Sequence, residues 1–230
     1  MRQELDELLC SRYPSIFRNR HAPESETVMC WGFACEDGWF ALIDALCAEI
    51  DARVKTKGCE PVVASQVKEK FGTLRFRVRG GDDYIQGLIQ MAGALSACSC
   101  ERCGEPGGRV CCPACHDRCP DEHASSVGDM ADEDAPGRGP SHGETLDSLP
   151  PRRAFRLPEV QTARWHPLAR ELERVIEAEI RQGEMPPIFV DAVIETETLA
   201  FRWRGGDNTG RAAGFFRMVE AYSARVAPAR

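Results

Sequence analysis

Apolar residues recur three or four positions apart in four stretches of the chain. This spacing places them on one face of a helix and predicts amphipathic α-helices. The four stretches are residues 39–54, 85–95, 168–180 and 212–226. Gly58 and Gly183 follow two of them, at positions where a glycine commonly ends a helix. A shorter helix is predicted around Leu5, Leu8 and Leu9.

Between the helices of each half, the pattern changes to an alternation of apolar and polar residues. This period of two is typical of a half-buried strand. The alternating apolar residues are Leu74, Phe76 and Val78 in the first half and Leu199, Phe201 and Trp203 in the second. Residues 62–70 and 188–197 are the predicted preceding strands. A Gly-Gly turn then leads to Asp82 or Asp207, where we expect a helix N-cap.

The two halves also resemble each other residue by residue. Residues 58–82 align with 183–207 without a gap at an offset of 125, and 10 of these 25 positions are identical. We therefore expect an α+β fold of two pseudo-symmetric α-β-β-α units with antiparallel hairpins, plus a small zinc knuckle. Since a lone hairpin is marginally stable, the two units should pack together. The assembly would be a monomer with an internal pseudo-twofold axis or a homodimer.

Seven of the twelve cysteines lie between residues 98 and 119. Two Cys-x-x-Cys pairs separated by a short glycine-rich loop have the spacing of a zinc ribbon or knuckle, in which four thiolates surround the ion. The predicted ligands of a structural zinc are Cys100, Cys103, Cys112 and Cys115. A closed site of this kind leaves no position for a water molecule. Four further residues are near enough in sequence to act as alternative ligands: Cys111, His116, Cys119 and His123.

An acidic segment separates the halves. Residues 124–150 contain six carboxylates and one arginine among glycine, proline and serine, and we expect a flexible linker. The predicted organisation is an N-terminal unit with a helical extension, a zinc-ribbon-like knuckle, the linker, and a repeat without cysteines. Their ranges are 1–97, 98–123, 124–150 and 151–230.

Composition narrows the class of protein. The 230 residues are 43% hydrophobic and 28% charged, which excludes a collagen-like or disordered chain. No apolar run approaches the roughly 18 residues of a membrane span, so no membrane association is expected. The N-terminal residues lack the apolar core of a secretory signal, and we expect a cytoplasmic location with reduced cysteines.

Several motifs resemble those of a known family. The stretches are Arg12–Phe17, Cys30–Phe40 and Val67–Phe76, together with Gly80-Gly81-Asp82 and the Cys100/Cys103 pair. Over roughly residues 8–120, they resemble an uncharacterised family of small bacterial and phage proteins with a zinc-ribbon-like cysteine segment. The resemblance implies a small cytoplasmic protein, often carried on mobile elements, with no known activity. The chain departs from this family by its second, cysteine-free copy and its crowded second cysteine pair.

The chain carries no nucleotide-binding glycine motif, no His-Glu-x-x-His and no Gly-x-Ser-x-Gly, so we do not expect an enzyme. The leading hypothesis is a non-catalytic, zinc-containing binding or regulatory protein that acts through a protein partner and is encoded by a phage or mobile element. A second hypothesis is a nucleic-acid-binding zinc-ribbon protein, and a third is an enzyme with a site between the halves. The candidate contacts for nucleic acid or a partner are Arg75, Arg77, Arg79, Arg202 and Arg204.

Two observations count against the nucleic-acid hypothesis. Residues 1–97 carry 12 basic and 14 acidic side chains, and residues 151–230 carry 13 and 11, so neither half is strongly basic. No aromatic residue is interleaved with the arginines on the predicted strand face. We therefore expect that face to be solvated, with cross-strand ion pairs in the second copy.

Overall fold

The computed structural model describes residues 1–25, 27–105, 112, 115, 154–206 and 210–227. The predicted linker and four of the candidate ligands, Cys111, His116, Cys119 and His123, lie outside these residues. Within them the protein is mixed α+β. Among the described helices, none combines the length and apolar character that a membrane span requires.

Five α-helices and five strands are described, together with three short 3₁₀ turns. The helices are α1 (Gln3–Arg12), α2 (Phe40–Lys57), α3 (Asp83–Ser96), α5 (His166–Gln182) and α6 (Arg211–Arg225). The strands are β1 (Phe33–Ala34), β2 (Val63–Lys70), β3 (Thr73–Arg79), β4 (Ile188–Glu195) and β5 (Leu199–Gly205). The 3₁₀ turns are η1 (Val28–Trp31), η2 (Asp37–Trp39) and η3 (Ala163–Trp165).

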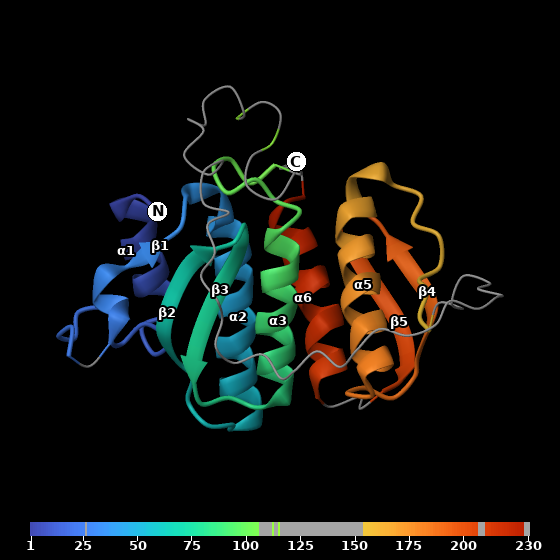
Figure 1. Ribbon diagram of the computed structural model, residues 1–230, viewed down its shortest axis with the longest axis horizontal. Coiled ribbons are helices and arrows are strands. Elements are labelled where there is room, and N and C mark those ends of the chain that lie inside the picture. Colours follow the sequence, from blue (N-terminus) through green and yellow to red (C-terminus); the bar gives the residue numbers. More distant parts are fainter. Residues whose placement is uncertain (26, 106–111, 113–114, 116–153, 207–209, 228–230) are drawn as a thin grey trace, which may run out of the picture.

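The long helices lie between two hairpins, one at each side of the molecule (Figure 1). β2 and β3 pair antiparallel, and so do β4 and β5, as the sequence predicts. β1 adds a parallel strand to β2, so that the first sheet has the order β1-β2-β3. This strand was not predicted, because a two-residue strand carries no readable periodicity.

The two halves share their order of elements, α2-β2-β3-α3 and α5-β4-β5-α6, and several local details. Each first helix follows a 3₁₀ turn that ends in a buried tryptophan, Trp39 or Trp165. Each hairpin has one register shift in its first strand. Asp82 caps α3 through the N–H of Ile85, as predicted. The described part of α6 has Gly210 at its N-cap, and the predicted cap Asp207 lies outside the described residues.

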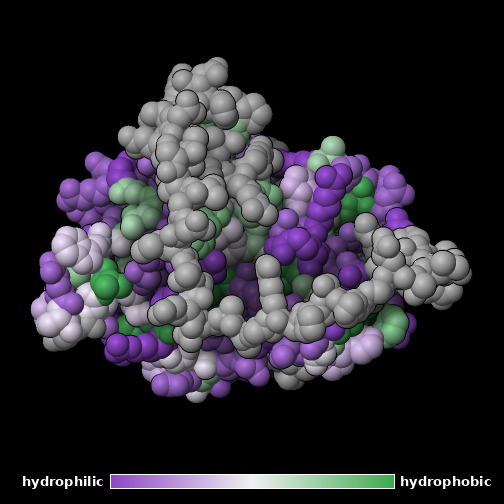
Figure 2. Space-filling view, viewed as in Figure 1, coloured by the Kyte–Doolittle hydropathy of each residue, from purple (hydrophilic) through white to green (hydrophobic). Residues whose placement is uncertain are grey.

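The buried apolar residues of both halves form one continuous core. α3 packs against β3 and α6 against β5, so the apolar strand faces are covered by helices. The ring of Trp203 stacks on Phe216 with their centroids 4.7 Å apart. The visible surface is mostly hydrophilic, with scattered hydrophobic patches (Figure 2). Burial of apolar area is therefore the main force that holds the halves together.

The closest approach between the halves is the contact of α3 with α6. A Cβ atom added to Gly87 of α3 would overlap the carbonyl oxygen of Arg211. One added to Gly214 of α6 would overlap the carbonyl oxygen of Tyr84 and lie 2.8 Å from the nitrogen of Leu88. The two helices thus meet backbone to backbone, which requires glycine at both positions.

One serine in each half secures a strand to the following helix. The N–H of Leu74 donates to Ser96 Oγ at 2.8 Å, and the N–H of Leu199 donates to Ser223 Oγ at 2.9 Å. Both serines are fully buried. Each hydroxyl also donates to a carbonyl of its own helix.

We expect Ser96→Ala and Ser223→Ala each to lower the free energy of unfolding by about 1–3 kcal/mol, because a buried strand N–H loses its acceptor. The measurement is urea unfolding followed by tryptophan fluorescence. Ser65→Ala is the control, since its hydroxyl bonds to Arg77 O on the exposed side of the sheet, and should cost less than about 0.5 kcal/mol. Equal effects at Ser65 and Ser96 would contradict the role given to the buried hydroxyls.

Candidate metal centre

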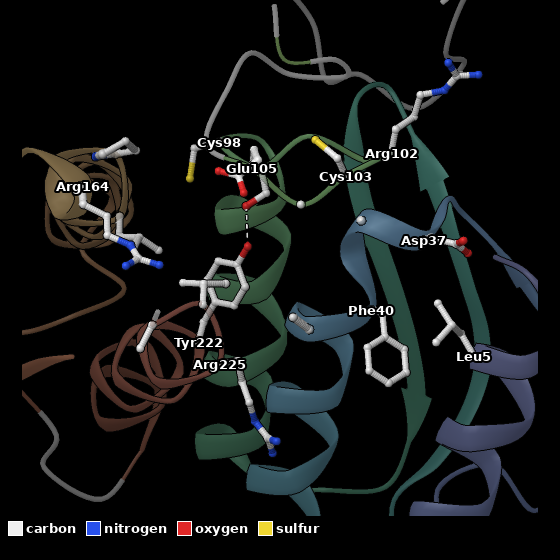
Figure 3. Close-up of a pocket in the computed structure, with 18 of the residues that line it drawn as sticks. Leu5, Asp37, Phe40, Cys98, Arg102, Cys103, Glu105, Arg164, Tyr222 and Arg225 are labelled. Carbon is white, nitrogen blue, oxygen red and sulfur yellow. Dashed lines mark hydrogen bonds between the residues drawn. The ribbon is translucent and has the colours of Figure 1, made fainter. Parts of the chain in front are cut away.

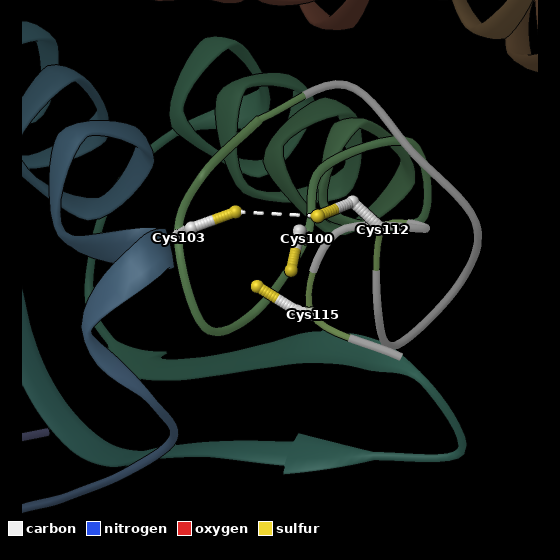
Figure 4. A group of neighbouring side chains, drawn as sticks. All are labelled: Cys100, Cys103, Cys112 and Cys115. Atoms are coloured by element: carbon white, nitrogen blue, oxygen red, sulfur yellow. Dashed lines mark hydrogen bonds between the residues drawn. The ribbon is translucent and has the colours of Figure 1, made fainter. Parts of the chain in front are cut away.

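The structure brings together the four cysteines whose spacing predicts a metal site. The sulfurs of Cys100, Cys103, Cys112 and Cys115 all lie within 4.8 Å of one another (Figure 4). Those of Cys103 and Cys112 are 3.5 Å apart. Around a tetrahedral zinc with Zn–S bonds of about 2.3 Å, neighbouring sulfurs are about 3.8 Å apart. The donor set and its spacing therefore fit a zinc ion.

A tight main-chain loop positions the first cysteine pair. α3 ends at Ser96, and the chain continues through a turn in which the N–H groups of Cys98 and Ser99 donate to carbonyls of the helix. The N–H of Cys100 then donates to Glu105 O, and the N–H of Gly104 donates to Cys100 O, both at 2.8 Å. We call residues 98–105 the cysteine loop. The compact fold of this loop lets the sulfurs of Cys100 and Cys103 point to one centre.

The environment of Cys100 favours its thiolate. Burial opposes ionisation, but N–H groups of Cys103, Cys112 and Arg102 donate to the sulfur and lower its pKa to about 7. For Cys103, the N–H of Glu105 lowers the pKa, while desolvation and hydrogen bonds to the other sulfurs outweigh it and raise the pKa to about 12. A bound cation would displace the thiol protons of its cysteine ligands, because metal ligands must be deprotonated.

The cysteine loop docks on the start of the first long helix. The N–H of Gly38 donates to Glu101 O at 2.7 Å, and a Cβ at Gly38 would overlap the main chain of Cys100 and Gly104. The buried carboxylate of Glu101 accepts from the N–H of Glu36 at 2.9 Å. Burial raises the pKa of Glu101, although this hydrogen bond opposes the shift.

Two further hydrogen bonds of Ser99 tie the cysteine loop to both halves of the protein. Trp39 Nε1 donates to Ser99 O at 3.2 Å. The Ser99 hydroxyl is 2.7 Å from the hydroxyl of Tyr222, which reaches from α6 toward the loop (Figure 3). Trp165 holds the position of Trp39 in the second half, but its indole nitrogen has no hydrogen-bond partner among the described residues. The loop therefore contacts α6 as well as η2, the turn that precedes α2.

A cavity of about 790 Å³ lies beside the cysteine loop, between the two halves (Figure 3). Two of its arginines form ion pairs, Arg2 with Asp37 at 3.1 Å and Arg225 with Asp44 at 2.8 Å. An enzyme site between the halves would need converging carboxylates or histidines. Among the described residues that line the cavity, Asp37 and Glu105 are the only carboxylates, and no histidine is present.

Burial raises the pKa of four described cysteines outside the cluster. Burial is the first cause that raises the pKa of Cys10, Cys35 and Cys98 to about 12. Cys47 is fully buried, and its pKa is also raised well above the usual value. Such thiols behave as small hydrophobic groups.

The arginines predicted as contacts are exposed but lie on two separate surfaces. Arg75, Arg77 and Arg79 project from β3, and Arg202 and Arg204 from β5. Because the two hairpins lie on opposite sides of the helices (Figure 1), the five arginines do not form one surface. In the second hairpin, Arg204 pairs with Asp191 at 3.2 Å, which confirms a predicted cross-strand ion pair.

The chain was also compared with known proteins. No family model matches it, and neither a curated protein nor a solved structure does. The resemblance to phage and bacterial proteins therefore rests on the motifs quoted above. The cysteine cluster is consistent with the zinc-ribbon-like segment of that resemblance.

Proposed function

We propose that this protein is a non-catalytic, zinc-containing binding protein in which the zinc is structural. The observation that carries the proposal is the group of four cysteine sulfurs within 4.8 Å of one another. Four thiolates complete a tetrahedral zinc site and leave no position for water or substrate, unlike catalytic zinc sites with three protein ligands. The ion would hold the cysteine loop against Gly38 and Tyr222.

The arrangement around the site supports a structural role. The cysteine loop has few apolar side chains of its own, so a metal is an effective way to stabilise it. The loop contacts both halves, which we propose to be two pseudo-symmetric copies of one unit. A folded loop would then support the packing of α2 against α6.

The partner is the part of the proposal that depends most on sequence. The proposed role is binding or regulation in the cytoplasm through a macromolecular partner, with a protein as the first expectation and a phage or mobile element as the source.

X-ray absorption at the zinc edge of purified, reduced protein tests the proposal. We expect one zinc per chain, surrounded by four sulfurs at about 2.3 Å. Metal content by mass spectrometry gives the stoichiometry. A coordination shell with a nitrogen or oxygen atom would contradict a closed four-cysteine site, and would favour an alternative ligand or an open, catalytic position.

A further inference from the structure

The outer face of the first sheet carries a concentration of positive charge. Side chains alternate across a strand, so the face opposite buried Leu74 and Phe76 is formed by alternate residues of β2 and β3. In the pairing register, Lys68 lies opposite Arg75 and Gln66 lies opposite Arg77. The cations on this face are Lys68, Lys70, Arg75, Arg77 and Arg79.

No carboxylate neutralises these five cations on the sheet itself. The other residues paired on this face are neutral: Ala34, Val63, Gln66 and Thr73. Glu69 is not on this face, and its carboxylate accepts from the N–H of Gly72 at 2.6 Å. None of the five cations forms an ion pair with a described residue. Their mutual repulsion is unfavourable in the free protein, which favours an anionic partner.

A groove extends this basic face. A space of about 410 Å³ is lined by Arg77 and Arg79 on one side and by Thr27 and Val28 of the segment leading into η1 on the other. Glu24 also borders the groove, without an ion pair to either arginine. The groove gives a chain-like ligand a path across the sheet, from β3 toward η1.

Two exposed aromatic rings belong to elements next to the basic face: the turn between β2 and β3, and η1, which contacts β2. Phe71, at the turn between β2 and β3, is 79% exposed and has a φ of +57°, which is unfavourable for a residue with a side chain. The Lys70 ammonium lies 4.8 Å from its ring centroid. Trp31 of η1 is 70% exposed. Neither ring contributes to the core, and both offer a flat surface on which a base can stack.

The corresponding face of the second hairpin also carries an exposed ring, Phe189, but it carries less positive charge. There, Arg204 is paired with Asp191 and lies over the ring of Phe189, 5.2 Å from its centroid. Ile194 and Ala200 occupy neighbouring outward positions. That face carries little net charge, so a basic surface is a property of the first hairpin and not of the shared fold.

We propose that the outer face of the β1-β2-β3 sheet binds single-stranded nucleic acid. The five cations contact phosphates, and Phe71 and Trp31 stack on unpaired bases. A single strand is favoured over a duplex, because bases within a duplex do not expose their faces to side chains. This inference rests on the proposed binding function and assigns a nucleic acid as the ligand of this face.

Fluorescence anisotropy of the full chain with a labelled oligothymidylate tests this inference. For five phosphate contacts on a single strand, the slope of log K against log salt is about −3.5, and the combined variant R75Q/R77Q/R79Q should reduce it to about −1.4. Phe71→Ala should weaken binding about tenfold and leave the slope unchanged. The matched control R202Q/R204Q removes two exposed arginines from the other hairpin and should change neither quantity.

Three outcomes would overturn the inference: no binding at low salt, a duplex bound as tightly as the single strand, or an equal loss in R202Q/R204Q. An RNA oligomer of the same length shows whether ribose matters, and binding of either single strand supports the inference. Zinc absorption spectra of every variant should match that of the wild type. A failure of strand binding with an intact four-sulfur zinc site would therefore reject this partner and leave the proposed metal role standing.

Discussion

Replacing Cys103 by serine is expected to reduce the zinc content from one ion per chain to almost none. Cys103 is exposed, so its loss disturbs coordination and not packing. Serine has nearly the same shape but is a poor zinc ligand. Because structural zinc sites contribute apparent binding energies on the order of 10–16 kcal/mol, loss of one thiolate should release the ion and unfold the cysteine loop. Native mass spectrometry measures the metal content.

Cys47→Ser is the matched control for this prediction. Cys47 is fully buried in α2, far in sequence from the cluster, and the substitution should lower stability by about 1–3 kcal/mol while the zinc stays bound. Wild-type protein that is free of metal after preparation with reductant and without chelator would contradict the site. Full zinc in Cys103→Ser would shift the ligand set toward Cys115 and the residues outside the described ranges, Cys111, Cys119 and His123.

Substitution of Gly87 by alanine is expected to destabilise the protein by about 3 kcal/mol, as measured by urea unfolding. The added methyl group would overlap Arg211 O, and main-chain atoms cannot rotate away as a side chain can. The helices must therefore separate. The expected loss of unfolding free energy lies near the upper end of the range for overpacked cores. This cost exceeds the gain of about 1 kcal/mol that alanine brings to a helix.

Gly93→Ala provides the control within the same helix. There, the atom nearest to the new methyl group is Leu74 O at 3.2 Å, which requires a shift of only a few tenths of an ångström. We expect a change within about 1 kcal/mol. The pair Gly87→Ala and Gly214→Ala should be less costly together than the sum of the two, since helices already separated by one methyl group accommodate the second. Equal effects at Gly87 and Gly93 would show that the helices do not meet at Gly87.

The strongest periodic patterns of the sequence correctly predicted most of the described elements. The long helices and both antiparallel hairpins follow from apolar spacing, because each element buries one face and the pattern records which residues belong to it. The cap predicted at Asp82 is confirmed, because its carboxylate accepts from the N–H of Ile85. β1 was missed because its pairing with β2 depends on distant residues.

At the candidate site too, the features that depend on neighbouring residues were predicted, and those that depend on distant residues were not. The spacing of the two Cys-x-x-Cys pairs was sufficient to predict which four sulfurs the structure brings together. The docking of the cysteine loop on Gly38 could not be predicted, because contacts between main-chain atoms leave no trace in residue type other than a glycine. The exposure of Phe71 and Trp31 was missed for a related reason: both are large apolar residues, which sequence reasoning assigns to a core.

The contact at Gly38 has a consequence for how this region tolerates evolutionary change. The loop recognises Gly38 through carbonyl and N–H groups of Cys100, Glu101 and Gly104, and every amino acid except proline supplies both of these groups. We therefore expect selection to act on the absence of side chains at positions 38 and 104 and on the proposed metal ligands, Cys100 and Cys103. The buried side chains of Ser99 and Glu101 bond to Tyr222 and Glu36, so change is tolerated mainly at the exposed positions 102 and 105, where lineages can diversify the outer surface without undocking the loop.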